Sequence, residues 1–191
     1  MSKTNYGSVT APQPRAVLHP VPYVPAGALV AGKFFPAVDG GLEDPVASSD
    51  YANSQPPVDG KIASAGHAEA SALDAAAVHW TMNEVRSAAS VTVTWAIDAP
   101  KATRRFNYFL TRPGWDPAKP LARDQFETKP IHTEASELDP YYMHQRDLLP
   151  ASETKHTVNL PERSGYHVLL AVWEFADSPN AVYQVIDLAF S

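Results

Sequence analysis

Apolar and polar residues alternate along short segments in the second half of the chain. At positions 90–96 the order Ser-Val-Thr-Val-Thr-Trp-Ala repeats every second residue. This period of two is typical of a β-strand with one buried face. Apolar runs bounded by turn residues predict further strands at 106–111, 156–160, 166–175 and 182–190. Together they predict an all-β fold, an antiparallel β-sandwich of about seven or eight strands with little helix.

The remaining segments have less regular patterns. Residues 1–57 are rich in Pro, Gly, Ala and Ser, which predicts extended segments and turns lying over a core made elsewhere. Residues 68–78 are rich in alanine and predict one or two short helical turns. Residues 130–150 contain three prolines and predict a long loop. We expect a single domain over residues 1–191, with an irregular N-terminal arm and loop region at 1–57 and a core at 58–191.

The composition of the 191-residue chain fits a folded domain. Hydrophobic residues make up 45% of it, enough for a core, and charged residues only 19%. The net charge is −6 and no stretch collects the basic residues, so we expect no nucleic acid partner. Eighteen prolines disfavour long helices. No apolar run approaches the roughly 18 residues that cross a bilayer, so we expect no membrane span.

Cysteine usage and the first residues bear on location. The chain contains no cysteine, which favours a reducing compartment. Residues 1–20 lack the apolar run of a secretory signal peptide. We therefore expect a cytoplasmic protein, or one exported without a signal peptide as part of an assembly.

Three separated segments carry a family resemblance. They are Asp-Gly-Lys-Ile-Ala-Ser-Ala-Gly at 59–66, the segment from Asn-Tyr-Phe-Leu-Thr to Asp-Gln-Phe at 107–126, and the segment from Arg-Ser-Gly-Tyr-His-Val to Leu-Ala-Phe at 163–190. In this order they resemble the bacterial chitin-binding proteins classed as lytic polysaccharide monooxygenases of the auxiliary activity 10 type. The resemblance implies a fibronectin type III-like or immunoglobulin-like sandwich, in agreement with the predicted strands.

Catalysis in that family depends on a copper ion held by a histidine brace. The resemblance places Tyr6 where the family has its N-terminal histidine, Lys101 where it has the second histidine, and Val182 where it has a phenylalanine beside the copper. A phenol and an ammonium are both protonated at neutral pH and offer no lone pair comparable with that of imidazole. Five residues precede Tyr6, so its nitrogen lies in a peptide bond. We therefore expect no metal site, no catalytic residue and no cofactor.

Aromatic residues in loops are the candidates for binding. Tyr51 precedes the segment at 59–66, where the family often has a surface aromatic residue used against chitin, and it is a candidate carbohydrate-binding residue. Tyr141, Tyr142 and Met143 form a candidate protein interface, because aromatic residues and methionine are enriched at protein contacts.

Histidines and acids in the family-like segments have structural interpretations. For His156 and His167 we expect packing with a hydrogen bond. Glu174 and Asp177 precede a turn, and turn chemistry is expected there in place of the facing carboxylates that glycoside hydrolysis requires.

Three hypotheses of function remain. The missing brace favours a non-catalytic, monooxygenase-like binding module, a structural or accessory subunit of a larger assembly whose partners are other protein subunits or a second copy of this chain. The alternative is a binding protein for chitin or another N-acetylglucosamine polymer, including peptidoglycan. The last is an active copper enzyme with a rewired site, which alone requires copper as cofactor.

Overall fold

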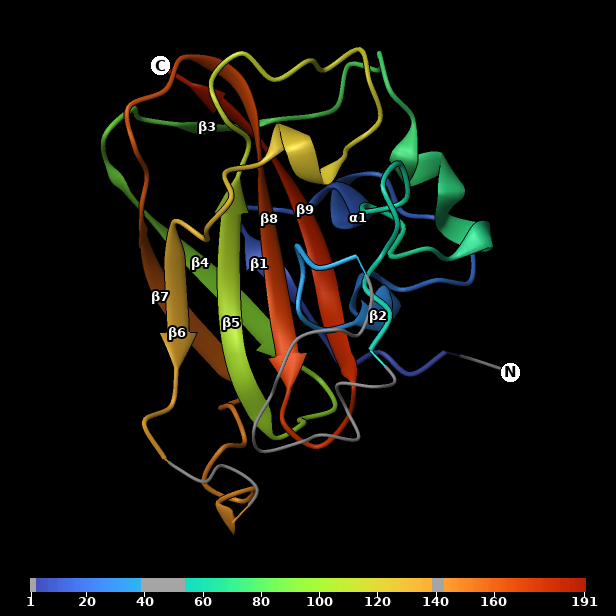
Figure 1. The fold of residues 1–191 in the computed structure, drawn as a ribbon, viewed down its shortest axis with the longest axis vertical. Coiled ribbons are helices and arrows are strands. Elements are labelled where there is room, and N and C mark those ends of the chain that lie inside the picture. The colour runs from blue at the N-terminus through green and yellow to red at the C-terminus, as the bar shows by residue number, and fades with distance from the viewer. Residues whose placement is uncertain (1–2, 39–53, 139–142) are drawn as a thin grey trace.

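Two β-sheets pack face to face in the computed structural model, which describes residues 3–38, 54–138 and 143–191 (Figure 1). The three-stranded sheet has the order β1 (Gly7–Ala11), β4 (Ser90–Ile97) and β7 (Glu153–Asn159). The larger sheet has the order β2 (Val30–Gly32), β9 (Asn180–Phe190), β8 (Gly165–Phe175), β5 (Thr103–Leu110) and β6 (His132–Ala135). β3 (Asn83–Val85) pairs in parallel with β9, and the other described strand pairs are antiparallel. The predicted all-β sandwich is confirmed, with nine strands in the described ranges.

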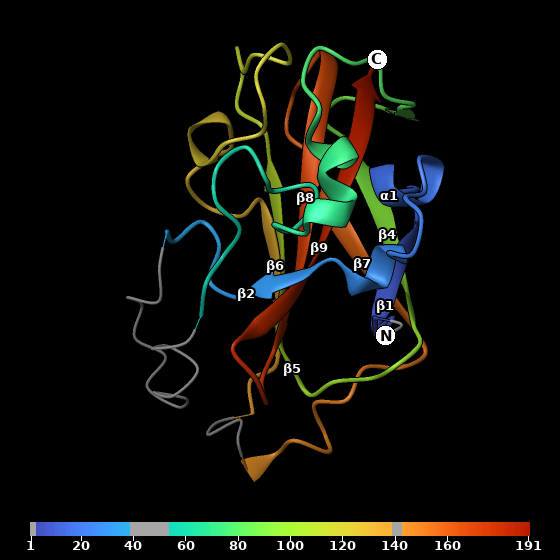
Figure 2. The same cartoon turned by 90° about the vertical axis from the view of Figure 1, so that its right-hand side faces the viewer.

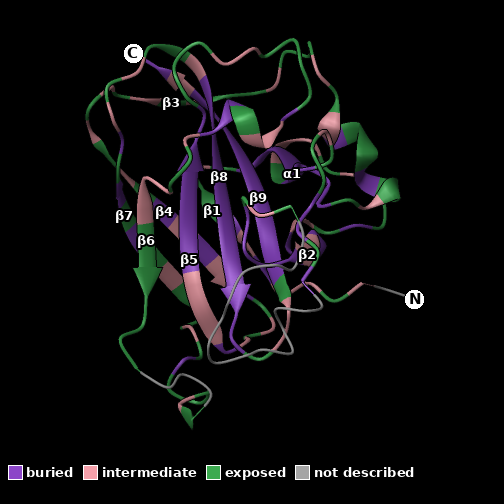
Figure 3. Ribbon diagram, viewed as in Figure 1, coloured by how far each residue is buried: buried purple, intermediate pink, exposed green. Residues whose placement is uncertain are grey.

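Side chains on the two faces of the larger sheet enter two different apolar layers. One layer lies between the sheets and includes Trp95, Tyr108 and Trp173. The other covers the outer face of the larger sheet and includes Phe35 and Tyr183. Because successive residues of a strand point to opposite faces, β8 and β9 are buried along nearly their whole length (Figure 3). Burial on both faces explains why these strands are almost continuously apolar.

The five predicted strands correspond to β4, β5, β7, β8 and β9. The alanine-rich segment forms the short helix η2 (Ala68–Asp74), which contributes Ala70 and Leu73 to the outer layer. Seen from the side, η2 and α1 (Arg15–Leu18) lie on the same face of the molecule (Figure 2). A further short helix, η3 (Arg123–Gln125), follows the turn after β5. Among the described residues no helix is long and apolar enough to cross a bilayer.

The N-terminal segment is part of the core, so the expectation that it lies over a core made elsewhere is wrong. It contains β1, α1, the short helix η1 (Ala26–Ala28) and β2. Val9, Leu29 and Phe35 are at most 2% exposed. These elements have only three to five residues each, too few for a hydrophobic period to be visible in the sequence.

The segment at 130–150 contains a strand where a loop was predicted. β6 pairs with β5 at the edge of the larger sheet, with Tyr108 opposite His132 and Phe106 opposite Glu134. Its sequence, His-Thr-Glu-Ala, has no apolar face, because most of its side chains point to solvent. An edge strand of this kind is held by backbone pairing, which leaves no hydrophobic pattern to detect.

Candidate functional site

Tyr6 and Lys101 meet at one end of the sandwich, around the ring of Phe175. Tyr6 immediately precedes β1, Lys101 lies in the connection from β4 to β5, and Phe175 is the last residue of β8. The rings of Tyr6 and Phe175 have centroids 5.1 Å apart. The Lys101 ammonium nitrogen lies 5.9 Å from the centroid of the Phe175 ring. The structure therefore brings together two positions that are 95 residues apart in the sequence; we call this region the Tyr6–Lys101 end.

Val182 lies beneath this end. It is fully buried in β9, opposite Trp173 of β8 and Val30 of β2. The Tyr6 ring packs against the apolar cluster to which Val182 belongs. An aliphatic side chain in this position contributes only packing.

The backbone of Tyr6 is tied on both sides. Its amide nitrogen donates a hydrogen bond to the Gly27 carbonyl oxygen at 3.0 Å. Its carbonyl oxygen accepts hydrogen bonds from the nitrogens of Asp98 and Ala99, both at 2.9 Å. The preceding residue is also anchored, since Asn5 Nδ2 donates to Asp98 Oδ2 at 2.5 Å. An amide nitrogen that donates its proton in this way has no lone pair to offer a metal.

The Lys101 side chain forms an ion pair with Asp177 in the turn between β8 and β9. Nζ of Lys101 lies 2.7 Å from Oδ2 of Asp177, and the two side chains are 30% and 26% exposed. Copper in proteins prefers neutral nitrogen ligands such as imidazole. The phenol, the paired ammonium and the aliphatic side chain at this end do not fit a copper ion held by a histidine brace. The Lys101 ammonium and the Asp177 carboxylate are partly exposed at this end, and both can form hydrogen bonds.

Glu174 supports the Tyr6–Lys101 end from inside, so the expectation of turn chemistry at this residue is wrong. Its side chain is fully buried, and Oε2 lies 2.6 Å from Nε of Arg105. Oε1 accepts a hydrogen bond from the Phe34 nitrogen at 3.0 Å. The carboxylate thereby joins β8 to β5 and to the segment after β2. Asp177, by contrast, lies in the turn as predicted.

The predicted loop candidates are only partly described. Tyr51, Tyr141 and Tyr142 lie outside the described residues. Met143 is 71% exposed. Its role as a protein interface stays a prediction.

The two histidines of the family-like strands are buried and hydrogen-bonded, as predicted. His156 is 8% exposed, and its Nδ1 lies 2.5 Å from the Tyr108 hydroxyl oxygen. His167 is 5% exposed, and its Nδ1 lies 2.9 Å from Thr111 Oγ1. Burial is the main cause that lowers the pKa of both imidazoles. Nearby basic groups lower it further, His132 in the case of His156 and Arg163 in the case of His167.

The two-sheet sandwich defines a class of protein that comparison with known proteins makes specific. The model of the family described as "lytic polysaccharide mono-oxygenase, cellulose-degrading" matches residues 30–188. The chain belongs to this family. Among curated proteins, the GlcNAc-binding protein A of Vibrio vulnificus (strain YJ016) is 37% identical over 135 residues, which cover 70% of this chain and 26% of the relative. The chain thus spans about a quarter of the length of the curated relatives it matches.

Solved structures agree over nearly the whole chain. A chitin binding domain from Burkholderia pseudomallei has a TM-score of 0.88 and 44% sequence identity, covering 97% of this chain and 99% of that one. An AA10 monooxygenase from Photorhabdus luminescens has a TM-score of 0.76 and 32% identity, with the same coverage of both chains.

The comparisons correct one expectation. The cytoplasmic location, or export without a signal peptide, is wrong, because the GlcNAc-binding relatives and the AA10 monooxygenases are secreted chitin-binding proteins. The absence of cysteine was the misleading signal, since a sandwich with a large apolar core is stable without disulfides.

Proposed function

We propose that this chain binds chitin or a related N-acetylglucosamine polymer without oxidising it, through the Tyr6–Lys101 end. Relatives named as GlcNAc-binding and as a chitin binding domain support the choice of ligand, at 37% and 44% identity. GlcNAc binding and chitin binding are what the names of those two proteins state. The proposal carries them to this chain because its end of the sandwich offers groups that can bind a sugar polymer.

The chemistry at Tyr6 and Lys101 is the observation that supports binding without oxidation. The nitrogen of Tyr6 is engaged as a hydrogen-bond donor to Gly27, and the Lys101 ammonium is paired with Asp177. The two charged groups, which are 30% and 26% exposed, can hydrogen-bond sugar hydroxyls and acetamido groups. Such groups position a polymer but supply no nucleophile or redox centre.

Retention on insoluble polysaccharides tests the binding. We expect the protein to be retained on chitin and less on cellulose. Lys101→Ala should weaken retention by about two- to tenfold, the range of one ordinary net hydrogen bond of about 0.5–1.5 kcal/mol. Lys155→Ala is the matched control, because Lys155 forms an exposed pair with Glu153 on β7. No retention of the parent protein, or equal losses in both variants, would overturn the proposal.

Copper titration tests the second part. We expect no tight 1:1 copper complex by electron paramagnetic resonance and no oxidised oligosaccharides from chitin when copper and a reductant are supplied. Release of oxidised products that depends on Lys101 or Tyr6 would show that the end is catalytic. The accessory role in a protein assembly stays a prediction, and native mass spectrometry of the recovered protein measures it.

A further inference from the structure

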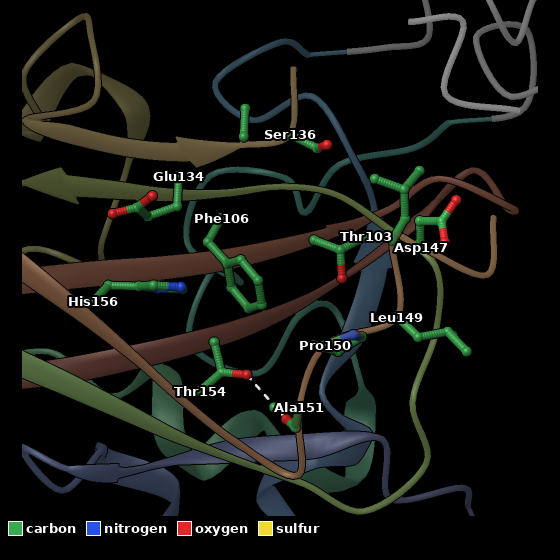
Figure 4. Close-up of a pocket in the computed structure, with 12 residues that line it drawn as sticks. Thr103, Phe106, Glu134, Ser136, Asp147, Leu149, Pro150, Ala151, Thr154 and His156 are labelled. Atoms are coloured by element: carbon green, nitrogen blue, oxygen red, sulfur yellow. Dashed lines mark hydrogen bonds between the residues drawn. The ribbon is translucent and has the colours of Figure 1, made fainter. Parts of the chain in front are cut away.

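Three histidines have a pKa below the ordinary value near 6.5, because burial disfavours the charged imidazole; they are His67, His156 and His167. Figure 4 shows His156 near Phe106, in the wall of a hollow beside β5 and β6. The hydrogen bonds of His156 and His167 lie within the sandwich, so their protonation acts on the core. His67 differs from them, because its partners belong to two segments that are distant in the sequence.

The imidazole of His67 links η2 to β2 and to the segment before β1. His67 immediately precedes η2. Its Nε2 lies 3.0 Å from the carbonyl oxygen of Val30, the first residue of β2. Its Nδ1 lies 2.9 Å from Nζ of Lys3, which lies before β1. One ring therefore joins segments that are 37 and 64 residues away from it in the sequence.

The Lys3 ammonium determines which protonation state of His67 makes these contacts. An ammonium group donates hydrogen bonds and accepts none, so Nδ1 has to offer its lone pair. The single proton of the neutral imidazole then lies on Nε2, which donates it to the Val30 carbonyl oxygen. The Val30 nitrogen lies 3.3 Å from Nε2, and two proton-bearing nitrogens form no hydrogen bond with each other. Neutral His67 thus makes both contacts at once.

Protonation of His67 removes one of these contacts and keeps the other. The new proton occupies Nδ1, so the lone pair that accepts from Lys3 is lost and two cations face each other. Nε2 keeps its proton and its bond to Val30. Lys3 retains Glu69 of η2, whose Oε2 lies 3.3 Å from Nζ. The Glu69 side chain is 60% exposed, and exposed ion pairs hold a chain only weakly.

The charges around His67 determine the pH at which this change occurs. Burial lowers the pKa of His67 most, and Lys3 lowers it further. A backbone hydrogen bond and the Glu69 carboxylate raise it. Lys61 and Asp74 line a hollow together with His67, so they belong to its surroundings as well. His67 is therefore neutral at about pH 7.5 and gains its proton only below about pH 6.5.

We propose that His67 is a pH-operated latch, whose neutral form holds the segment before β1 on η2 and whose protonated form releases residues 3 and 4. The release ends at Asn5, because Asn5 Nδ2 donates to Asp98 and the Tyr6 nitrogen donates to Gly27 in either state of His67. The Tyr6–Lys101 end stays in place, so the latch does not depend on the chitin binding proposed above.

Relaxation measurements on ¹⁵N-labelled protein test the release. We expect the amide order parameters of residues 3 and 4 to fall from about 0.8 near pH 7.5 to below about 0.6 near pH 5. The amides of Asn5 and Tyr6 should keep their values. Equal order at residues 3 and 4 at the two pH values, or a loss of order that extends to Tyr6, would overturn the proposal.

Charge variants measure the coupling between the two groups. Lys3→Met keeps the length of the side chain without its charge, and it should raise the proton-binding constant of His67 by about two- to tenfold. By thermodynamic linkage, protonation of His67 weakens its hold on Lys3 by the same factor. Glu69→Gln should lower the proton-binding constant, because the Glu69 carboxylate favours the charged imidazole. Titration of the His67 ring signals by nuclear magnetic resonance gives both values.

Two further variants separate the latch from general effects of acid. Lys155→Met removes an exposed lysine on β7 and should leave the titration of His67 unchanged. His67→Gln cannot titrate in this range, so its residues 3 and 4 should have the same order at about pH 7.5 and 5. Release that persists in His67→Gln would assign the switch to another group and overturn the proposal. An unchanged His67 titration in Lys3→Met, or the same shift in Lys155→Met, would overturn it as well.

Discussion

Arg15 and Asp187 form a two-point ion pair inside the protein. Nε and Nη2 of Arg15 lie 3.0 Å and 2.6 Å from the two carboxylate oxygens of Asp187, and the side chains are 4% and 0% exposed. The Trp80 ring packs over the guanidinium at 4.2 Å, and the Tyr166 hydroxyl donates to Asp187 Oδ1. The pair fastens α1 to β9, and so holds the N-terminal segment on the sandwich.

Replacing Arg15 by Met should therefore destabilise the protein by about 3–5 kcal/mol, because it leaves the Asp187 carboxylate buried without a counter-charge. Urea unfolding measures the change. Lys155→Met, which breaks the exposed pair with Glu153, should cost less than about 1 kcal/mol. Similar losses in both variants would contradict the structural role of the Arg15–Asp187 pair.

Gly27 sets the distance at which the residues before β1 approach the core. A methyl group added there would lie 2.3 Å from Asn5 Oδ1 and 2.6 Å from the backbone nitrogen of Gly7. Gly27→Ala should therefore cost about 1–3 kcal/mol, as overpacking does, and displace Tyr6. Because Tyr6 belongs to the proposed binding surface, its displacement should also reduce retention on chitin.

Gly114→Ala is the comparison for this prediction. Gly114 has a φ of +76° with open space around it, so alanine there costs only the backbone strain, about 1 kcal/mol. Unfolding and chitin retention should be measured on both variants. Loss of retention in the Gly114 variant, or its preservation in the Gly27 variant, would show that the position of Tyr6 does not matter for binding.

The predictability of the fold depended on how many residues each element has. The eleven-residue strands β8 and β9 carry a hydrophobic run long enough to be recognised, and the eight-residue β4 shows a clear alternation. The three-residue β2 and the polar β6 have neither, so their existence depends on strands that are distant in the sequence. Pairing of this kind is not encoded locally.

The candidate site was predictable only where a residue could be aligned with the family. Tyr6, Lys101 and Val182 were placed in this way, and the structure brings Tyr6 and Lys101 to the same Phe175 ring. The role of Glu174 gave no such signal, because it depends on partners 69 and 140 residues away. A buried carboxylate or imidazole looks the same in a sequence as an exposed one.

Tyr23 occupies an unfavourable backbone conformation at the surface. Its φ is +66° and its side chain is 96% exposed, within a turn closed by Val21 and Val24. Side chains other than Gly, Asn and Asp lose about 1–2 kcal/mol in the left-handed region. Tyr23→Asn should therefore raise the free energy of unfolding by about 0.5–1 kcal/mol, and Tyr23→Val should lower it, because β-branched residues are worst there. Equal stability of the two variants would contradict this account.

Acid should destabilise the fold through His156 and His167. Burial lowers the pKa of each imidazole in the folded protein, below the value near 6.5 of an exposed histidine. Below about pH 6.5 the unfolded chain therefore binds protons that the folded protein does not, and stability is lost as the pH falls. Above that pH both states are neutral at these groups and the contribution is complete.

Each histidine should add up to about 1.4 kcal/mol of lost stability per pH unit in this window. Urea unfolding at about pH 7.5, 6.5 and 5.5 measures how the free energy of unfolding changes with pH across the range in which histidine titrates. His167→Asn removes one of the two groups and keeps a polar side chain toward Thr111. It should lower the free energy of unfolding at about pH 7.5. It should also make the decline between about pH 6.5 and 5.5 shallower, because one of the two groups that bind protons on unfolding is gone. A slope identical to that of the parent protein would mean that His167 binds its proton equally well in both states.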